Sequence, residues 1–150
     1  MIEQYGNIWA LKGNAICVTT NGFVKKNGEA VMGRGIAKEA NEYYPGLSKT
    51  LGGFIKLYGN HVFPLYFDGQ SDQIILSFPV KHNWFETADM ELIRRSCQEL
   101  MEYVDKTSPI KRALLPRPGC GNGRLRWEDV KKEIEPLLDD RISVVTFYKS

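Results

Sequence analysis

The chain has 150 residues, of which 43% are hydrophobic and 25% charged, and its net charge is +2. This size and composition predict one globular domain with a substantial core, and the near balance of acids and bases does not by itself indicate a nucleic-acid-binding protein. The three cysteines form neither a disulfide framework nor a Cys-x-x-Cys metal pair, which favours a reducing, cytoplasmic compartment, and we find neither a signal peptide nor an apolar run of ~20 residues that would span a membrane.

Short strands and helices alternate along the chain. The predicted strands are rich in Val, Ile, Phe and Tyr and are bounded by Gly, Asn, Asp or Pro. They are Ile2–Leu11, Ala15–Thr20, His61–Phe67, Gln73–Phe78, Arg112–Leu115 and Ile142–Tyr148. The predicted helices are Gly35–Tyr44, Leu47–Leu57 (a short one), Ala88–Val104 and Trp127–Leu138. This alternation predicts a layered α/β domain with a sheet in the middle and helices on both faces.

The third predicted helix has the clearest pattern. Its apolar residues recur at steps of three and four and form one stripe. They are Leu92, Ile93, Cys97, Leu100, Met101 and Val104. Thr87 or Asp89 is a suitable cap for its start. A Pro-Gly pair ends the first helix, and Pro136 predicts that the last helix kinks or ends near Glu135.

Two glycine-rich segments each lead into a predicted helix. Pro116–Trp127 follows a buried-strand pattern and holds three glycines within five residues, and Met32–Ala37 opens the first helix. Neither matches the P-loop or the Rossmann fingerprint. Backbone amides at such junctions bind oxyanions, because glycines let a ligand approach and the helix dipole favours negative charge. Both segments fall at the carboxyl ends of strands, where α/β sheets bind ligands, so they predict a diphosphate held from two sides.

Four segments occur in one order with consistent spacing: Ala15–Asn21, Met32–Ala37, Phe78–Trp84 and Pro118–Trp127. Together they resemble the macro domain family, and more narrowly its compact branch, which includes the terminal ADP-ribose glycohydrolase and the antitoxin that removes ADP-ribose from DNA thymidine. The Gly-Cys-Gly loop and the Phe-Pro-x-Lys-x-x-Trp segment are the most specific parts. The resemblance covers nearly the whole chain. It implies a three-layer α/β/α sandwich with a mixed central sheet of about six strands, whose cleft binds ADP-ribose.

The resemblance also implies which residues contact ADP-ribose. Asn7 stands where the family usually has an aspartate that accepts from the adenine amino group, Asn21 ends the second strand near the distal ribose, and Arg34 adds charge to the first phosphate loop. The predicted ligand contacts are Asn7, Ile8, Asn21, Gly33, Arg34, Gly35, Ile36, Ala37, Pro118, Gly119, Cys120, Gly121, Asn122, Gly123 and Arg124. We expect no metal and no cofactor, because the two histidines have no matching acids.

Among the candidate residues, Lys81 is the side chain that most directly suggests a catalytic role. A lysine beside a strand end is commonly just solvated, but in the resembling glycohydrolase a lysine at the matching place attacks the anomeric carbon of the distal ribose. Such an attack needs a neutral amine and hence a lowered pKa. That enzyme also has an aspartate as acid–base partner in its Gly-Cys-Gly loop, where this chain has Gly123. We therefore predict Lys81 and Asn21 as the catalytic residues, with Lys81 positioning the ribose or stabilising its charge.

Other side chains near these motifs have simpler explanations. His61 lies in a strand pattern and is predicted to be structural, His82 is predicted to be a surface imidazole, and Trp127 is predicted to pack on the sheet. Trp84 and Phe85 either close over the nucleotide or anchor the following helix, and the sequence leaves both interpretations open.

The predicted function is a hydrolysis that releases ADP-ribose from a modified macromolecule. Two alternatives use the same cleft: a phosphatase acting on ADP-ribose 1″-phosphate, and a non-catalytic module that binds ADP-ribose. The sequence does not identify the carrier as protein, DNA, RNA or metabolite. Nucleic acid is expected only as part of a substrate, through Arg117, Arg124 and Arg126 beside the cleft. A monomer without membrane contact is expected.

Overall fold

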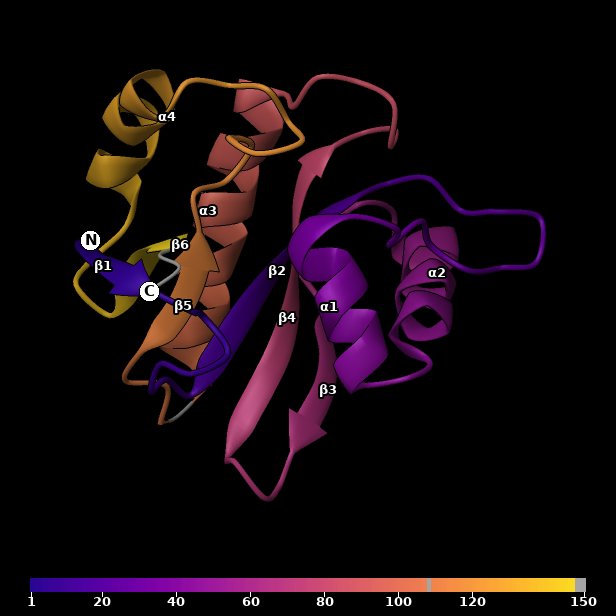
Figure 1. Ribbon diagram of the computed structural model, residues 1–150, viewed down its shortest axis with the longest axis horizontal. Helices are drawn as coiled ribbons and strands as arrows, with labels where there is room; N and C mark the ends of the chain where they lie inside the picture. Colours follow the sequence, from indigo (N-terminus) through magenta and orange to yellow (C-terminus); the bar gives the residue numbers. More distant parts are fainter. Residues whose placement is uncertain (108, 148–150) are drawn as a thin grey trace.

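The structure is a computed structural model that describes residues 1–107 and 109–147 (Figure 1). Within these residues six strands form one sheet in the order β1-β6-β5-β2-β4-β3. The strands are β1 (Ile2–Gly6), β2 (Ala15–Asn21), β3 (Pro64–Asp68), β4 (Gln73–Lys81), β5 (Ala113–Pro116) and β6 (Ile142–Phe147). Neighbouring strands are parallel, except that β3 is antiparallel to β4, so the sheet is mixed as the resemblance implied.

Helices cover both faces of the sheet (Figure 1). They are α1 (Gly35–Tyr43) and α2 (Leu47–Tyr58) on one face, and α3 (Met90–Lys106) and α4 (Trp127–Ile134) on the other. Successive side chains of β2 point to opposite faces of the sheet. Cys17 therefore packs with α3 and α4, while Ile16 and Val18 pack with α1 and α2. The three-layer α/β/α architecture predicted from the sequence is confirmed. Among the described residues, no helix is long and apolar enough to cross a membrane.

The first strand is shorter than predicted. The prediction of Ile2–Leu11 is wrong beyond Gly6, because the chain turns at Asn7. The carbonyl of Asn7 accepts from the N–H of Ala10 at 2.9 Å, and its side-chain oxygen accepts from the N–H of Trp9 at 3.0 Å. The apolar residues that extended the strand pattern pack from this turn into the layer of α1 and α2 instead.

The hairpin of β3 and β4 lies further along the chain than predicted. The strand expected at His61–Phe67 begins at Pro64, because the N–H of Phe63 donates to a serine hydroxyl on β4 at 2.8 Å instead of to a neighbouring backbone. β4 runs beyond its predicted end at Phe78 and finishes at Lys81. Lys81 therefore belongs to the sheet and does not lie on a loop after it.

The remaining strands follow the prediction closely. β2 and β5 each run one residue further than expected, to Asn21 and Pro116. β6 begins at Ile142 as predicted, and Tyr148, its predicted last residue, lies outside the described part of the chain.

The helix ends follow from local chemistry. α3 begins after Asp89, whose side chain accepts from the N–H of Glu91 at 3.0 Å, so one of the two predicted caps is confirmed. α4 stops at Ile134 and a 3-10 turn, η1 (Glu135–Leu137), follows, with Pro136 ending the α-helix where predicted. α2 begins at Leu47 as predicted and ends at Tyr58, one residue beyond its predicted end.

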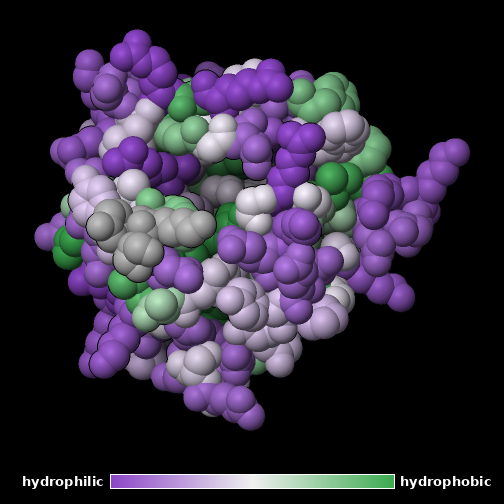
Figure 2. All heavy atoms as spheres, viewed as in Figure 1, coloured by the Kyte–Doolittle hydropathy of each residue, from purple (hydrophilic) through white to green (hydrophobic). Residues whose placement is uncertain are grey.

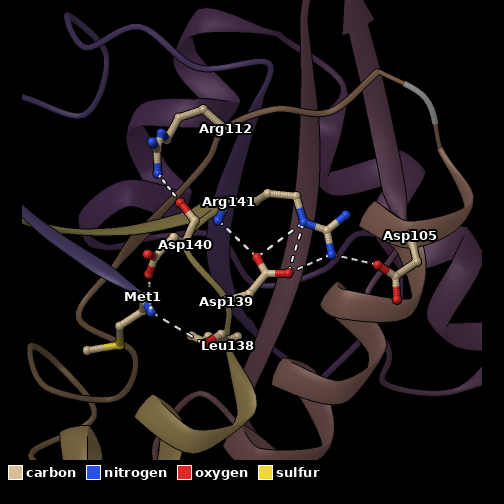
Figure 3. Close-up of polar contacts among 7 residues, drawn as sticks. All are labelled: Met1, Asp105, Arg112, Leu138, Asp139, Asp140 and Arg141. Atoms are coloured by element: carbon tan, nitrogen blue, oxygen red, sulfur yellow. Dashed lines mark hydrogen bonds and ion pairs between the residues drawn. The ribbon is translucent and has the colours of Figure 1, made fainter.

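Charged groups tie the chain together at the amino ends of β1 and β6 (Figure 3). Arg141, just before β6, donates through Nη2 to Asp105 at 2.6 Å and to Asp139 at 2.7 Å. The N-terminal ammonium of Met1 contacts the carboxylate of Asp140 at 3.1 Å. This cluster joins the end of α3 to the start of two strands, at the edge of the sheet from which the parallel strands begin.

Candidate functional site

A cleft of about 620 Å³ opens at the carboxyl ends of the parallel strands. Figure 2 shows a hollow near the middle of one face of the molecule. Such a volume falls within the roughly 300–1,000 Å³ of small-ligand sites. Open α/β sheets bind their ligands at this edge, so the cleft is the candidate site.

Most of the predicted ligand contacts line this cleft. The two glycine-rich segments contribute Gly33–Ala37 and Gly119–Gly123, and Ile8, Asn21 and Lys81 line it as well. The two segments face each other closely, since a Cβ built on the first at position 35 would lie 3.5 Å from the side-chain nitrogen at position 122 of the second. Their backbone amides therefore border one shared space.

Three predicted contacts do not line the cleft. Asn7 is exposed, and its side-chain oxygen accepts from the backbone of its own turn. Pro118 is buried. Arg124 is exposed at φ +67°. Their contacts with ADP-ribose stay predictions.

The cleft also contains residues that the motifs did not single out. Thr20 lies at the end of β2 and is 4% exposed, and its hydroxyl has no hydrogen-bond partner among the described residues. Phe147 lies at the end of β6, and Glu39 lies on α1. Thr20 and Phe147 occupy strand ends, so the rule that ligands lie beyond these ends was the signal that would have found them.

Arg117 lines the cleft beside the second glycine-rich segment. Its guanidinium lies 5.0 Å from the ring centre of Trp127, a cation–π contact. Trp127 is half-buried and its indole N–H donates to Glu3 at 3.3 Å. The Trp127 ring therefore contacts both Glu3 of β1 and Arg117. The Nε atom of Arg117 is buried and has no partner within the described ranges.

The second glycine-rich segment depends on two glycines that leave no room for a side chain. Gly119 has φ +76°, and a Cβ there would lie 2.8 Å from the Cδ1 atom of Ile93. A Cβ on Gly123 would lie 2.5 Å from the carbonyl oxygen of Gly119 and 2.8 Å from the Cβ of Ala88. An aspartate therefore does not fit at position 123 of this loop. This gives a physical reason for the departure from the resembling glycohydrolase.

Gly33 and Gly121 are glycines of another kind. A Cβ built on either one would have no described atom within 4 Å. Neither has a positive φ, and both line the cleft. Neither packing nor backbone conformation therefore requires glycine at these two positions. The absence of a side chain instead allows a ligand to reach the backbone.

Lys81 and Asn21 lie opposite each other where β2 and β4 separate. They are partners in the sheet register, which shifts between Thr20 and Asn21 in the manner of a β-bulge. The side chain of Asn21 donates to the carbonyl of Val31 at 3.1 Å and accepts from the N–H of Phe23 at 3.0 Å. Each amide atom retains capacity for one more hydrogen bond. The sheet thus brings the two predicted catalytic residues together.

The amine of Lys81 lies in a partly desolvated and cationic environment. Burial lowers its pKa, and the charges of Arg124 and Arg34 lower it further. Its Nζ donates to the carbonyl oxygen of Trp84 at 3.2 Å. A lowered pKa raises the share of neutral amine, which is the nucleophilic form of lysine.

Asn60, a residue that the sequence analysis did not identify, holds the backbone of Lys81 in place. The Asn60 side chain donates to the Lys81 carbonyl at 2.9 Å, and the Asn60 carbonyl accepts from the guanidinium of Arg95. Gly22 makes room for this amide, because a Cβ there would lie 2.8 Å from its nitrogen. The N–H of Gly22 in turn donates to the carbonyl of His82 at 3.1 Å.

The other titratable candidates serve structure. His61 contacts Glu99 of α3 at 2.7 Å, in keeping with the predicted structural role. His82 is exposed and contacts Asp89 at 2.8 Å, which lowers the pKa of that carboxyl. Burial raises the pKa of the Cys120 thiol to about 11, so this thiol is protonated near neutral pH. Among the residues with described positions, no group of His, Cys, Asp and Glu is arranged to hold a metal ion.

The sheet order gives the cleft two unlike ends. Ile8, Val145 and Phe147 line the end beside β1 and β6, where Thr146 is the one polar side chain among the described lining residues of these two strands. Asn21 and Lys81 supply an amide and an amine at the end beside β2 and β4, next to the apolar Val80 and Trp84. The glycine-rich segments follow β2 and β5, which lie in the middle of this row.

Several solved structures have the same fold. The macrodomain of Mycobacterium tuberculosis DarG superimposes with a TM-score of 0.80 and 26% identity, over 99% of both chains. The macrodomain of Thermus aquaticus DarG does so with a TM-score of 0.79 and 22% identity, again over 99% of both chains. Thermosipho africanus DarTG in complex with ADP-ribose matches with a TM-score of 0.77 and 18% identity, over 98% of this chain and 42% of that one.

Sequence similarity to a characterised protein is more limited. A stretch of 65 residues is 31% identical to the DNA ADP-ribosyl glycohydrolase of Thermus aquaticus. It represents 43% of this chain but just 18% of that protein. No protein-family model matches the chain.

Proposed function

We propose that this chain, which has the macro-domain fold, binds ADP-ribose in its cleft and is an ADP-ribosyl hydrolase. The observation that carries the proposal is the combination of two facing glycine-rich segments with a lysine of lowered pKa at one end of the space between them. The first feature fits a diphosphate and the second fits chemistry at a sugar attached to it.

The two unlike ends of the cleft support one direction for the nucleotide. The diphosphate lies between the glycine-rich segments, where backbone N–H groups are available. The adenine lies at the apolar end against Ile8 and Phe147, and the distal ribose lies at the polar end beside Asn21 and Lys81. This pose places the anomeric carbon, to which the carrier is attached, close to the end of β4.

Hydrolysis breaks the bond between the anomeric carbon and the carrier, adds the hydroxyl of water to that carbon and returns a proton to the leaving group. The transition state carries positive charge on the ribose ring, as in other glycoside hydrolyses. Asn21 and Lys81 hold the ribose in position for this step. The crowded Gly123 leaves no room for a loop carboxylate, so the reaction relies on positioning of the ribose and of the attacking water.

For the carrier we propose a nucleic acid. Support comes from the name of the sequence relative, a DNA ADP-ribosyl glycohydrolase, and from two arginines near Lys81. Arg34 lines the cleft, and Arg124 lies outside its lining but close enough to Lys81 for its charge to lower the pKa of that amine. The matched stretch spans under a fifth of that relative, so its activity is extended to this chain as a proposal.

The deciding experiment is to measure turnover and binding in the Lys81→Ala variant. We expect the turnover of an ADP-ribosylated oligonucleotide to fall by about a hundredfold or more, while calorimetry shows ADP-ribose affinity within a few-fold of the parent. Lys49→Ala, an exposed lysine on α2, is the matched control and leaves both unchanged. Equal loss of turnover and binding, or no loss of turnover, contradicts the role of Lys81.

A non-catalytic ADP-ribose-binding module is the second candidate, favoured by the absence of space for an acid at Gly123. Incubation with ADP-ribosylated DNA, ADP-ribosylated glutamyl and aspartyl peptides and ADP-ribose 1″-phosphate separates the possibilities. Tight ADP-ribose binding without turnover of any of them establishes the module. Turnover of the phosphate ester alone establishes a phosphatase.

A further inference from the structure

Two large aromatic side chains stand exposed on the loop between β4 and α3. Trp84 is 50% exposed and Phe85 is 62% exposed. Their rings contact each other edge to face, with centroids 5.4 Å apart and an interplanar angle of 88°. This arrangement anchors neither ring in the core, so the sequence-based alternative that they serve as a hydrophobic anchor for α3 does not explain them. We call the pair the aromatic rim.

The aromatic rim lies beside the reacting end of the cleft. Trp84 lines the cleft, and its carbonyl oxygen accepts from the Lys81 amine at 3.2 Å. The loop is fixed at its far end, where the N–H of Ala88 donates to the carbonyl of Gly123 at 3.0 Å and the N–H of Asp89 donates to the β4 backbone at 2.9 Å. Figure 1 shows this loop standing clear above the carboxyl end of β4. The rim is thus held beside Lys81, at the end of the cleft to which the proposed pose assigns the carrier.

We propose that Trp84 and Phe85 form a stacking platform for the nucleobase that carries the ADP-ribosyl group. This inference rests on the proposed function and names the residues that recognise the carrier.

The chemistry of the rim distinguishes a nucleobase from an acidic side chain. An exposed aromatic face gains free energy from a planar ring and tolerates any base, because every base has a π-face. An aspartyl or glutamyl carrier presents no such ring. The charges around the rim agree with a phosphate-bearing carrier, because Arg34 and Arg124 lie close enough to Lys81 to influence its titration. The loop carries two acids: Asp89 is paired with His82 at 2.8 Å, and Glu86, directly after Phe85, is an exposed negative charge.

The test compares two affinities in one protein, both measured in the Lys81→Ala background so that turnover does not interfere. One is for free ADP-ribose, by calorimetry, and the other is for a short single-stranded oligodeoxynucleotide bearing ADP-ribose on one base, by fluorescence anisotropy. We expect the oligonucleotide to bind about tenfold more tightly than free ADP-ribose. Trp84→Leu removes this advantage: affinity for the oligonucleotide falls by more than affinity for free ADP-ribose does. Trp84→Phe, which keeps a ring, restores most of it.

Two further variants guard against indirect effects. Phe85→Leu lowers the advantage in the same direction, and it serves as the test if a Trp84 variant does not fold. Tyr58→Leu removes an equally exposed aromatic ring, 64% exposed on α2, and leaves the advantage intact. An ADP-ribosylated glutamyl peptide binds all these variants with the affinity it has for the Lys81→Ala parent.

Three outcomes overturn the inference. The oligonucleotide advantage survives in Trp84→Leu, or affinity for free ADP-ribose falls as much as affinity for the oligonucleotide, or the glutamyl peptide loses affinity equally. Failure of the proposed function looks different: it is seen as an absence of ADP-ribose binding in the unsubstituted protein. If the oligonucleotide in that case still binds with an affinity that depends on the aromatic rim, the stacking platform is supported and the proposed hydrolase function is rejected.

Discussion

Lys81 is subject to two effects that lower the pKa of its amine, burial and the positive charges of Arg124 and Arg34. An ammonium beside an oxocarbenium-like ribose would raise the energy of the transition state, whereas a neutral amine does not. The protein therefore supplies, at the end of β4, a lysine that can give up its proton at a lower pH than an exposed lysine does. This is a property of the surroundings that the motif alone does not contain.

The pH dependence of turnover tests this view. We expect kcat to rise with pH and to level off above the lowered pKa of Lys81, because the neutral amine is the form that carries turnover. Arg124→Gln removes one of the charges that depress this pKa, so the midpoint of the rise moves to higher pH. Arg126→Gln, whose partner is Glu128 at 2.6 Å, is the control and leaves the midpoint where it was. A kcat that falls as pH rises identifies the ammonium as the active form and refutes the argument.

At the scale of the loops, two kinds of glycine in one segment have opposite consequences when substituted. Gly123→Asp places a side chain where the backbone of Gly119 and the methyl of Ala88 already lie, so we expect a loss of about 1–3 kcal/mol of stability and no gain of an acid catalyst. Gly121→Ala meets no described atom within 4 Å, so its melting temperature stays close to that of the parent. Because Gly121 lines the cleft, we expect the added methyl to hinder the ligand and ADP-ribose affinity to fall.

Thermal melting and calorimetry on the two variants check this contrast. Gly53→Ala, a substitution on α2 that likewise meets no described atom within 4 Å, is the control: its melting temperature does not fall, because alanine favours a helix interior over glycine, and its ADP-ribose affinity is unchanged. If Gly121→Ala binds ADP-ribose as tightly as the parent, the second glycine-rich segment does not contact the diphosphate. If Gly123→Asp folds with full stability, the loop is more adaptable than its packing indicates.

At the scale of strands, Asn60 holds the end of β4 through the Lys81 carbonyl. We expect Asn60→Ala to lower kcat by about tenfold, because a small misplacement of a reacting group is costly, and to leave ADP-ribose affinity nearly unchanged. Asn14→Ala is the matched control: its side chain accepts from the N–H groups of Lys111 and Arg112 at 2.8 and 3.1 Å, at the amino ends of β2 and β5. It costs comparable stability without an effect on kcat. If the two variants change kcat equally, the role of Asn60 is purely structural.

The elements show how far the sequence leads. The strand pattern predicted an end at Phe78 with Lys81 beyond it, whereas β4 continues to Lys81 and makes this lysine part of the sheet. The apolar pattern after Gly6 predicted a longer β1, but the turn at Asn7 directs the same apolar residues into the core from another side. Asn60 lies 21 residues from the carbonyl it binds. No local pattern reveals such a contact, because it depends on the register of β4 against β2 and on the missing side chain of Gly22.

At the scale of the whole molecule, the two edges of the sheet have separate roles. The carboxyl edge holds the cleft, and the amino edge holds the cluster around Arg141 that joins α3, β1 and β6 (Figure 3). The sequence predicted the first from strand ends and glycines. It did not predict the second, because Asp105 lies 36 residues from Arg141 and Met1 lies 139 residues from Asp140, and no motif marks these contacts.

Substitution of Arg141 tests whether the edges are independent. Hydrogen bonds from Arg141 lower the pKa of Asp139. A carboxyl with a pKa depressed by folding stabilises the protein at pH values above its unfolded pKa, and this stabilisation is lost as pH falls through the folded pKa. We therefore expect Arg141→Gln to lower the urea midpoint near neutral pH, and the difference from the parent to shrink below about pH 4, as the Asp139 carboxyl becomes protonated. ADP-ribose affinity stays unchanged.

The control is Lys25→Gln, which loses an exposed ion pair with Glu29 of 3.7 Å and shifts the urea midpoint little. A difference that persists in acid shows that the Arg141 contribution is packing and not charge, and a loss of ADP-ribose affinity shows that the two edges are coupled.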